Sequence, residues 1–295
     1  MLTRLISAIA LLLCLGACSS LPGADKAGAF PLLENGKAKP GVARLIVVIP
    51  GAFESTDIFA PILDWDLPDT AVVAYRFPGM DGLPADHRVD IDGSARLIAD
   101  YVNDIAPRDT YLVGFSTGGP IAIETAERLD HPARALALIS SAAGAPSALL
   151  ASARGAVDMA EAMLRSHSTD PQDTLTENYR TLLYGRDHYG DSAAAAKSET
   201  EAEGVRATMV RPSLRLTMAH SASLMTWVPD PDTDLAPARV GFFHGAGDPV
   251  FPLPATQRFA GQIHAQKVYT YPGQGHLLYE TSSRVFDDIR RFFGL

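Results

Sequence analysis

The stretch that decides the fold spans residues 111–118 and reads Tyr-Leu-Val-Gly-Phe-Ser-Thr-Gly. Its first five residues form a short apolar run, which is typical of a buried strand. Its last five have the pattern Gly-x-Ser-x-Gly, and a helical pattern begins at Gly118. A strand, a sharp turn and a helix in this order would strain the backbone at Ser116 and lift its hydroxyl clear of the sheet. Glycine is needed at 114 and 118 because larger side chains would collide across so tight a turn.

Short apolar runs alternate with helical patterns along most of the chain. Continuous apolar runs are typical of strands that are buried on both faces of a parallel sheet. Strands that alternate with helices predict an α/β fold with a mostly parallel sheet flanked by helices. The predicted strands are residues 45–49, 71–77, 111–115, 135–139, 240–243 and 268–271, and the predicted helices are residues 92–105, 118–129 and 283–293.

The alternation stops between about residues 146 and 236, where no strand pattern occurs. A structureless loop of that length is unusual within a compact domain. We therefore interpret residues 146–236 as a mainly helical cap, inserted into a core of residues 43–145 and 237–295. Residues 18–42 are rich in Gly, Ala, Pro and Ser, which indicates a tether.

A serine hydroxyl needs a base within hydrogen-bond reach to act as a nucleophile at neutral pH. Of the eight histidines, only His276 follows the last predicted strand, in a glycine-rich loop that would reach the same sheet edge as Ser116. His244 is the rival, but we expect it beneath the acid rather than over the serine. For the other six we expect surface or packing roles. Asp248, just beyond the strand 240–243, is the candidate carboxylate that would orient the base.

Backbone donors for a developing oxyanion are expected in two turns. One is Pro50-Gly51-Ala52-Phe53, which follows the first predicted strand, and the other is the turn that contains Ser116. We expect the N–H groups of Ala52 and Thr117 to converge, with that of Phe53 as the alternative in the first turn. One such donor is worth about 3 kcal/mol of barrier.

From about residue 43 to its end, the chain resembles the α/β-hydrolase superfamily of serine hydrolases. Ser116, Asp248 and His276 fall on that family's nucleophile, acid and base, in the chain order expected of the fold. Ala52 and Thr117 fall on its oxyanion positions, although Pro50 stands where many members have His. The resemblance implies hydrolysis of a carboxylic ester, or another small-molecule acyl substrate, through an acyl-enzyme and without a cofactor.

Three other functions remain open. The same residues serve acyltransferases and hydrolases of amide or carbon–carbon bonds, and a lipid-anchored binding protein could keep a vestigial site. No HExxH motif or Cys/His cluster predicts a metal site, and no phosphate-binding glycine motif predicts a nucleotide. The formal net charge of −9 and the lack of any Lys/Arg run argue against nucleic acid as a partner.

The N-terminus carries the features of an export signal. Arg4 precedes an apolar run, residues 5–15, that is too short to cross a bilayer and is typical of a secretory signal. The sequence Leu15-Gly16-Ala17-Cys18 resembles the lipobox of bacterial lipoproteins. This resemblance implies removal of residues 1–17, lipidation of Cys18 and a membrane as partner. Because Ser19 rather than Asp follows, it also implies the outer membrane of a bacterial cell envelope, facing the periplasm.

Overall fold

The computed structural model describes residues 32–34, 36–207, 209, 213–221, 224–230, 233 and 235–295. The predicted signal segment, Cys18 and residues 19–31 of the predicted tether lie outside this part of the chain.

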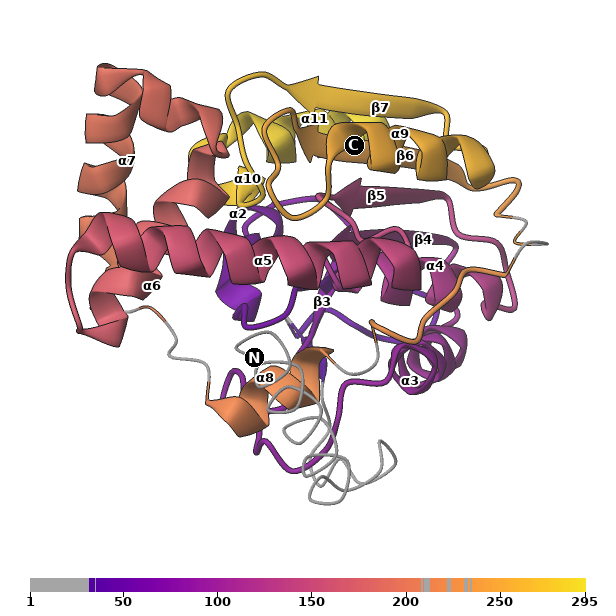
Figure 1. The fold of residues 1–295 in the computed structure, drawn as a ribbon. Helices are drawn as coiled ribbons and strands as arrows, with labels where there is room; N and C mark the ends of the chain where they lie inside the picture. Colours follow the sequence, from indigo (N-terminus) through magenta and orange to yellow (C-terminus); the bar gives the residue numbers. More distant parts are fainter. Residues whose placement is uncertain are drawn as a thin grey trace.

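Within the described residues, seven strands form one sheet in the order β1-β3-β2-β4-β5-β6-β7 (Figure 1). All neighbouring strands pair in parallel except β1, which is antiparallel to β3. This sheet confirms the predicted α/β fold. The strands are β1 (Leu32–Glu34), β2 (Arg44–Ile49), β3 (Thr70–Tyr75), β4 (Asp109–Phe115), β5 (Ala135–Ile139), β6 (Arg239–Gly245) and β7 (Lys267–Tyr271).

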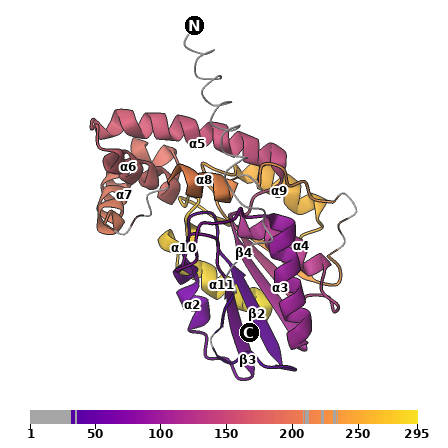
Figure 2. The same cartoon turned by 90° about the horizontal axis from the view of Figure 1, so that it is seen from below.

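Helices cover both faces of the sheet (Figure 2). On β2, Leu45 and Val47 belong to one apolar cluster, which also contains residues of α3, α4 and α9, whereas Ile46 and Val48 belong to the opposite one, with residues of α2 and α11. Both faces of the strand are therefore buried, which explains its continuous apolar run. These helices are α2 (Ala60–Leu63), α3 (Ile91–Ile105), α4 (Gly118–Glu127), α9 (Leu253–Gln262) and α11 (Arg284–Phe293).

The sheet begins earlier than the sequence indicated. β1 lies inside the segment interpreted as a tether, and its Leu33 pairs with Ala74 of β3. The side chain of Leu32 is buried. A strand of three residues is too short to show a periodic pattern, and its pairing with β3 decides its conformation. The helix α9 was also not predicted.

Between β5 and β6, the described residues form helices and no strand. These helices are α5 (Ala145–Ser166), α6 (Pro171–Tyr184), α7 (Ser192–Val205), α8 (Leu214–Ser221) and the short 3₁₀ helix η3 (Asp187–Gly190). Figure 2 shows α6 and α7 grouped at one end of the molecule and α5 running along its edge. They lie in the segment that we interpret as a cap. None of the helices described in the structure combines the length and apolar character needed to cross a membrane.

Candidate active site

Ser116 lies in the sharp turn between β4 and α4. β4 ends at Phe115 and α4 begins at Gly118, so Ser116 and Thr117 alone reverse the chain. The backbone of Ser116 is left-handed, with φ of +51°. This conformation is uncommon for a residue with a side chain and is a form of strain found at functional sites. A hydrogen bond of 2.9 Å from the N–H of Ser116 to the carbonyl of Ile139 holds the turn.

Three glycines make this turn possible. A Cβ atom on Gly114 would overlap the carbonyl oxygen of Gly118, and one on Gly118 would overlap that of Ile49. A Cβ atom on Gly51 would come within 2.7 Å of the Phe115 ring. The collision across the turn is thus present at Gly114, whereas at Gly118 the collision is with the end of β2. The turn after β2 packs directly against the turn of Ser116.

His276 lies between Ser116 and Asp248 and contacts both. Its Nε2 is 3.2 Å from the hydroxyl oxygen of Ser116, and its Nδ1 is 2.9 Å from Oδ2 of Asp248. All three side chains are buried, with 8% or less of each residue exposed. Three parallel strands of the sheet supply them: Ser116 follows β4, Asp248 follows β6 and His276 follows β7, with β5 between β4 and β6. A nucleophile, a base and a carboxylate at these distances can carry out acyl transfer.

Asp248 is placed to remain a carboxylate. Its Oδ1 accepts hydrogen bonds from the backbone N–H groups of Val250 and Phe251, at 2.8 and 2.9 Å. Burial pushes the pKa of Asp248 upward, but the charge and hydrogen bond of His276, with help from His244 and the Phe251 N–H, outweigh burial and lower the pKa. A persistent charge here favours the tautomer of His276 that carries a proton on Nδ1.

His244, the rival base, lies under the acid as the sequence indicated. Its Nε2 is 2.8 Å from the carbonyl oxygen of Phe251 and 3.6 Å from Oδ2 of Asp248. Because a carbonyl oxygen only accepts, Nε2 must carry the proton. Burial lowers the pKa of His244, which keeps it neutral. His244 therefore supports the acid loop, and its polar partners among the described residues are Phe251, Thr256 and Asp248 rather than Ser116.

The turn after β2 offers Ala52 as an oxyanion donor, and Phe53 is engaged elsewhere. The N–H of Phe53 donates to Nδ1 of His220 at 3.0 Å. Within the described chain, no protein hydrogen bond uses the N–H of Ala52 or of Thr117. Gly51, which precedes Ala52, packs against the Phe115 ring and the Cβ of Ser116, and Thr117 follows Ser116 directly in the chain. This geometry favours Ala52 over Phe53 as the donor from this turn.

The loop of His276 is bound to the end of α6. The N–H of Gly275 donates to the carbonyl of Leu183 at 2.7 Å, and the N–H of His276 donates to that of Leu182 at 2.7 Å. The last carbonyls of a helix have no partner within the helix, so these bonds satisfy them. The negative end of the α6 dipole consequently lies beside His276.

A carboxyl group and two phenols lie near His276. Burial raises the pKa of Glu54 to about 7, although a hydrogen bond with Tyr279 and the charge of His276 act in the opposite direction. Burial, followed by the charge of Glu54, holds the pKa of Tyr279 well above its ordinary value, and burial also raises that of Tyr179. Tyr279 packs edge-on against Phe115, with ring centroids 5.0 Å apart. A titratable carboxyl group therefore borders the candidate active site near neutral pH.

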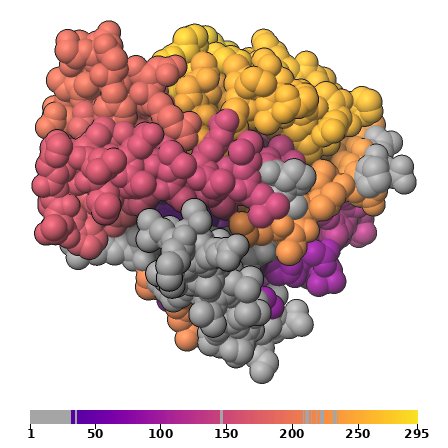
Figure 3. All heavy atoms as spheres, in the orientation of Figure 1, coloured from indigo at the N-terminus to yellow at the C-terminus, as the bar shows by residue number. Residues whose placement is uncertain are grey.

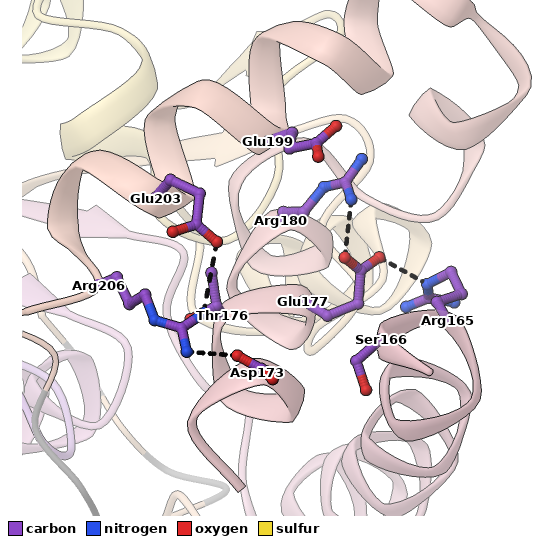
Figure 4. Close-up of a pocket in the computed structure, with 9 residues that line it drawn as sticks. All are labelled: Arg165, Ser166, Asp173, Thr176, Glu177, Arg180, Glu199, Glu203 and Arg206. Carbon is purple, nitrogen blue, oxygen red and sulfur yellow. Dashed lines mark hydrogen bonds and ion pairs between the residues drawn. The ribbon is translucent and has the colours of Figure 1, made fainter. Parts of the chain in front are cut away.

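The segment that we interpret as a cap contains an open, charged pocket of about 240 Å³ between α5, α6 and α7 (Figure 4). Glu177 bridges Arg165 and Arg180, at 3.0 and 2.7 Å, and Arg206 pairs with Asp173. The arginines are thus neutralised by acids of the same pocket. We interpret the pocket as a structural network that joins the three helices, since none of Ser116, Asp248 and His276 lines it.

Among the described residues, no group of three or more His, Cys, Asp and Glu side chains could hold a metal ion. A family model described as the alpha/beta hydrolase family matches residues 46–288. The chain therefore belongs to the alpha/beta hydrolase family, and this membership supports a hydrolase function.

Solved structures share this fold at low sequence identity. A thermophilic esterase from Thermogutta terrifontis has a TM-score of 0.59 at 18% identity, covering 88% of this chain and 92% of its own. A carboxylesterase of Nitrososphaera gargenis has a TM-score of 0.61 at 16% identity, covering 89% and 93%. A bromoperoxidase from Bacillus anthracis has a TM-score of 0.63 at 15% identity, covering 89% and 94%. The comparison with curated protein sequences found no match.

Sequence reasoning missed three residues that border the site. His220 was expected to have a surface or packing role, yet it is fully buried and accepts a hydrogen bond from the turn after β2. Glu54 and Tyr279 were not considered, although they follow Ala52 and His276 closely in sequence. That closeness to site residues was the available signal, but the contact between the two depends on the packing of separate segments.

Proposed function

We propose that this protein hydrolyses a carboxylic ester through an acyl-enzyme on Ser116. The observation that carries the proposal is the position of His276, with Nε2 3.2 Å from the Ser116 hydroxyl and Nδ1 2.9 Å from Asp248. Family membership and the esterase and carboxylesterase of the same fold support it.

In the acylation step, the Ser116 oxygen attacks the ester carbonyl carbon while His276 Nε2 takes the hydroxyl proton. The carbonyl oxygen becomes negative and accepts hydrogen bonds from the N–H groups of Ala52 and Thr117. Asp248 accepts the Nδ1 proton and stabilises the imidazolium, as does the negative end of α6 beside it. His276 then returns its proton to the departing alkoxide, which leaves as an alcohol.

In the deacylation step, a water molecule attacks the acyl carbon. His276 removes a proton from that water, and the same N–H groups bind the second oxyanion. When the intermediate collapses, the proton returns to Ser116 and the carboxylic acid is released. The acyl group thus passes from the alcohol to water, and the protein is regenerated.

Hydrolysis of a p-nitrophenyl ester series, from acetate to palmitate, tests the proposal. Ser116→Ala should lower turnover roughly 10⁴-fold or more. Ser140→Ala is the matched control, because Ser140 is also a buried serine, it directly follows the adjacent strand β5, and its Oγ has no hydrogen-bond partner among the described residues. The Ser140→Ala variant should retain ester turnover and should still be labelled by a fluorophosphonate, a probe that reacts with active-site serines.

The outcomes separate the alternatives. Labelling of the wild type without ester turnover would point to an amide or carbon–carbon bond as the substrate. Turnover that rises with added alcohol acceptors, giving new esters, would point to an acyltransferase. Turnover and labelling that survive in Ser116→Ala would contradict the proposed nucleophile.

We further propose that the protein is anchored to the outer membrane of a bacterial cell envelope, facing the periplasm, through lipid on Cys18. The support is the apolar run of residues 5–15 and the lipobox-like Leu15-Gly16-Ala17-Cys18 that follows it. Acyl chains on one cysteine anchor more firmly as their number increases.

A further inference from the structure

The largest group of exposed apolar side chains lies on one helix, α5. Among the large apolar residues described as exposed, five of seven belong to it: Leu149, Leu150, Val157, Met163 and Leu164. Their exposed fractions run from 47% for Leu150 to 69% for Leu164. Single exposed apolar residues are normal, whereas a contiguous group marks an interaction surface. We call these five residues the α5 stripe.

The stripe forms one face of the helix. At 3.6 residues per turn, its members fall within about 140° of the helix circumference. Ala153, Ala156 and Ala160 lie in the same sector and are exposed. Between residues 149 and 164 the sector contains no charged side chain, and the nearest ones, Glu161 and Arg154, lie just outside it.

The opposite face of α5 carries the charges. Asp158 is 3% exposed and binds Arg186 through both carboxylate oxygens, at 2.7 and 2.8 Å. Arg165 binds Glu177 of α6. A surface helix ordinarily turns its apolar face to the core and its charged face to water. α5 instead buries Asp158 together with Ala148 and Ala162, and turns an uncharged apolar sector outward. Water is therefore not the environment that this sector suits.

The position of α5 leaves this face accessible. α5 is 22 residues long and is the outermost helix at its end of the molecule (Figure 2). In the space-filling view its atoms lie at the surface across the middle of the face shown (Figure 3). A long helix at such a position can rest along a flat surface.

We propose that the α5 stripe rests on the membrane that anchors the protein, with its apolar side chains between the lipid headgroups. This inference goes beyond the proposed esterase activity, and its choice of occupant rests on the anchor proposed at Cys18. Residues 18–32 can extend over at most about 50 Å, so an anchored domain stays next to the bilayer. Helices that lie in the interface bury their apolar face about 5–10 Å into the headgroup region.

The charge of the protein predicts which lipids the α5 stripe should bind. The chain has a net charge of −9 and the stripe contains no basic residue, so attraction to anionic lipid is not the driving force. Binding should therefore occur on vesicles of phosphatidylcholine alone and should survive 0.5 M salt, because apolar insertion is not screened by ions.

The test uses environment-sensitive labels on the full chain. Its only cysteines are Cys14 and Cys18, so Val157→Cys and Asp100→Cys each introduce one reactive thiol in the folded domain, and the parent chain gives the labelling background. A nitrobenzoxadiazole label on Val157→Cys should shift to the blue and brighten severalfold when phosphatidylcholine vesicles are added. The label on Asp100→Cys, exposed on α3, should not change. Identical responses at the two positions would overturn the proposal.

A matched pair of charge variants gives the second arm. Val157→Glu and Val228→Glu introduce the same charge at sites that are 54% and 65% exposed. With the label on Leu149→Cys, Val157→Glu should abolish most of the response to vesicles, whereas Val228→Glu should preserve it. A label response without vesicles that grows with protein concentration, together with dimers in sedimentation, would instead assign the stripe to a second copy of this chain. Neither arm requires substrate, so the failure of this proposal is distinct from failure of the esterase proposal.

Discussion

The backbone N–H of Phe53 donates a hydrogen bond of 3.0 Å to Nδ1 of His220. The bond joins the turn after β2, which carries Ala52, to the last turn of α8. The other ring nitrogen, Nε2, is 2.7 Å from the carbonyl of Pro78, so it carries the proton and Nδ1 is the acceptor. The Phe53 ring stacks on the imidazole at 5.1 Å. A helix of the cap segment thus holds the turn that offers an oxyanion donor.

His220→Ala should therefore lower ester turnover. The change leaves the Phe53 N–H without its partner, and an unsatisfied group of this kind costs about 1–3 kcal/mol. If the whole cost falls on the transition state, turnover should drop roughly 5- to 150-fold. His220→Asn can still accept from Phe53 and should recover part of the loss. Values of kcat and KM for the three proteins test this, and equal kcat values would contradict a positioning role.

Burial also lowers the pKa of His220, so the folded state favours the neutral ring. The stability that His220 contributes is therefore complete above its ordinary pKa of 6.5 and is lost as pH falls through the lowered value. Protonation would place a hydrogen on Nδ1 opposite the Phe53 N–H. As pH falls below 6.5, ester turnover should therefore decrease less in His220→Asn than in the wild type, which a pH profile of kcat for the two proteins measures.

Asp248→Asn should lower kcat by roughly 10³- to 10⁴-fold, because an amide can donate to Nδ1 and so stabilise the wrong tautomer of His276. Steady-state kinetics on the preferred p-nitrophenyl ester measures the change. Asp158→Asn is the matched control, since Asp158 is equally buried but lies on α5 in an ion pair with Arg186. A similar loss in both variants would indicate general damage rather than loss of an orienting acid.

Glu54 should make the protein less stable as pH rises. Its pKa is raised from 4.5 to about 7, so the stability that the neutral form contributes is complete below 4.5 and is lost as pH passes through 7. Between pH 5 and 8, the free energy of unfolding should fall less in Glu54→Gln than in the wild type. The difference should be on the order of 1–3 kcal/mol. Urea unfolding at several pH values measures this, with Glu199→Gln at an exposed site as control. Parallel curves for Glu54→Gln and the wild type would refute it.

Gly118→Ala should destabilise the fold by about 1–3 kcal/mol and remove turnover, because the added methyl group meets the Ile49 carbonyl. Gly155→Ala is the contrasting variant. It lies within α5 with open space around its Cα, and it should stabilise the protein by about 0.5–1 kcal/mol. Thermal unfolding of the two variants is the measurement, and opposite signs are expected.

Cys18→Ser should shift the protein out of the lipid-modified membrane fraction, leaving an unprocessed or soluble form. Cys14→Ser is the matched control and should remain lipidated, because Cys14 lies in the segment that we propose is removed. Metabolic labelling with a fatty acid, followed by fractionation, separates the two. Incorporation of label into Cys18→Ser would contradict the assignment.

Much of the fold could be predicted from the sequence because interactions between residues close in the chain determine it. The strands β2 to β7 are short apolar runs buried on both faces, and each was predicted to within two residues at either end. At the turn of Ser116, Gly114 lies against the backbone of Gly118 within the same five residues, a local contact that excludes a larger side chain, whereas Gly118 lies against the carbonyl of Ile49 in the neighbouring strand. β1 escaped prediction because three residues carry no pattern, and its place depends on an open edge of β3.

By itself, the sequence determined the parallel α/β architecture and singled out Ser116, Asp248 and His276, because burial and turn sterics act on near neighbours in the chain. Only the tertiary structure decided that Phe53 is bound by His220, that the His276 loop rests on the end of α6, and that Glu54 meets Tyr279. It also decided which face of α5 is exposed. These are contacts between segments far apart in sequence, and hydrophobic periodicity carries no information about which distant partner a side chain meets.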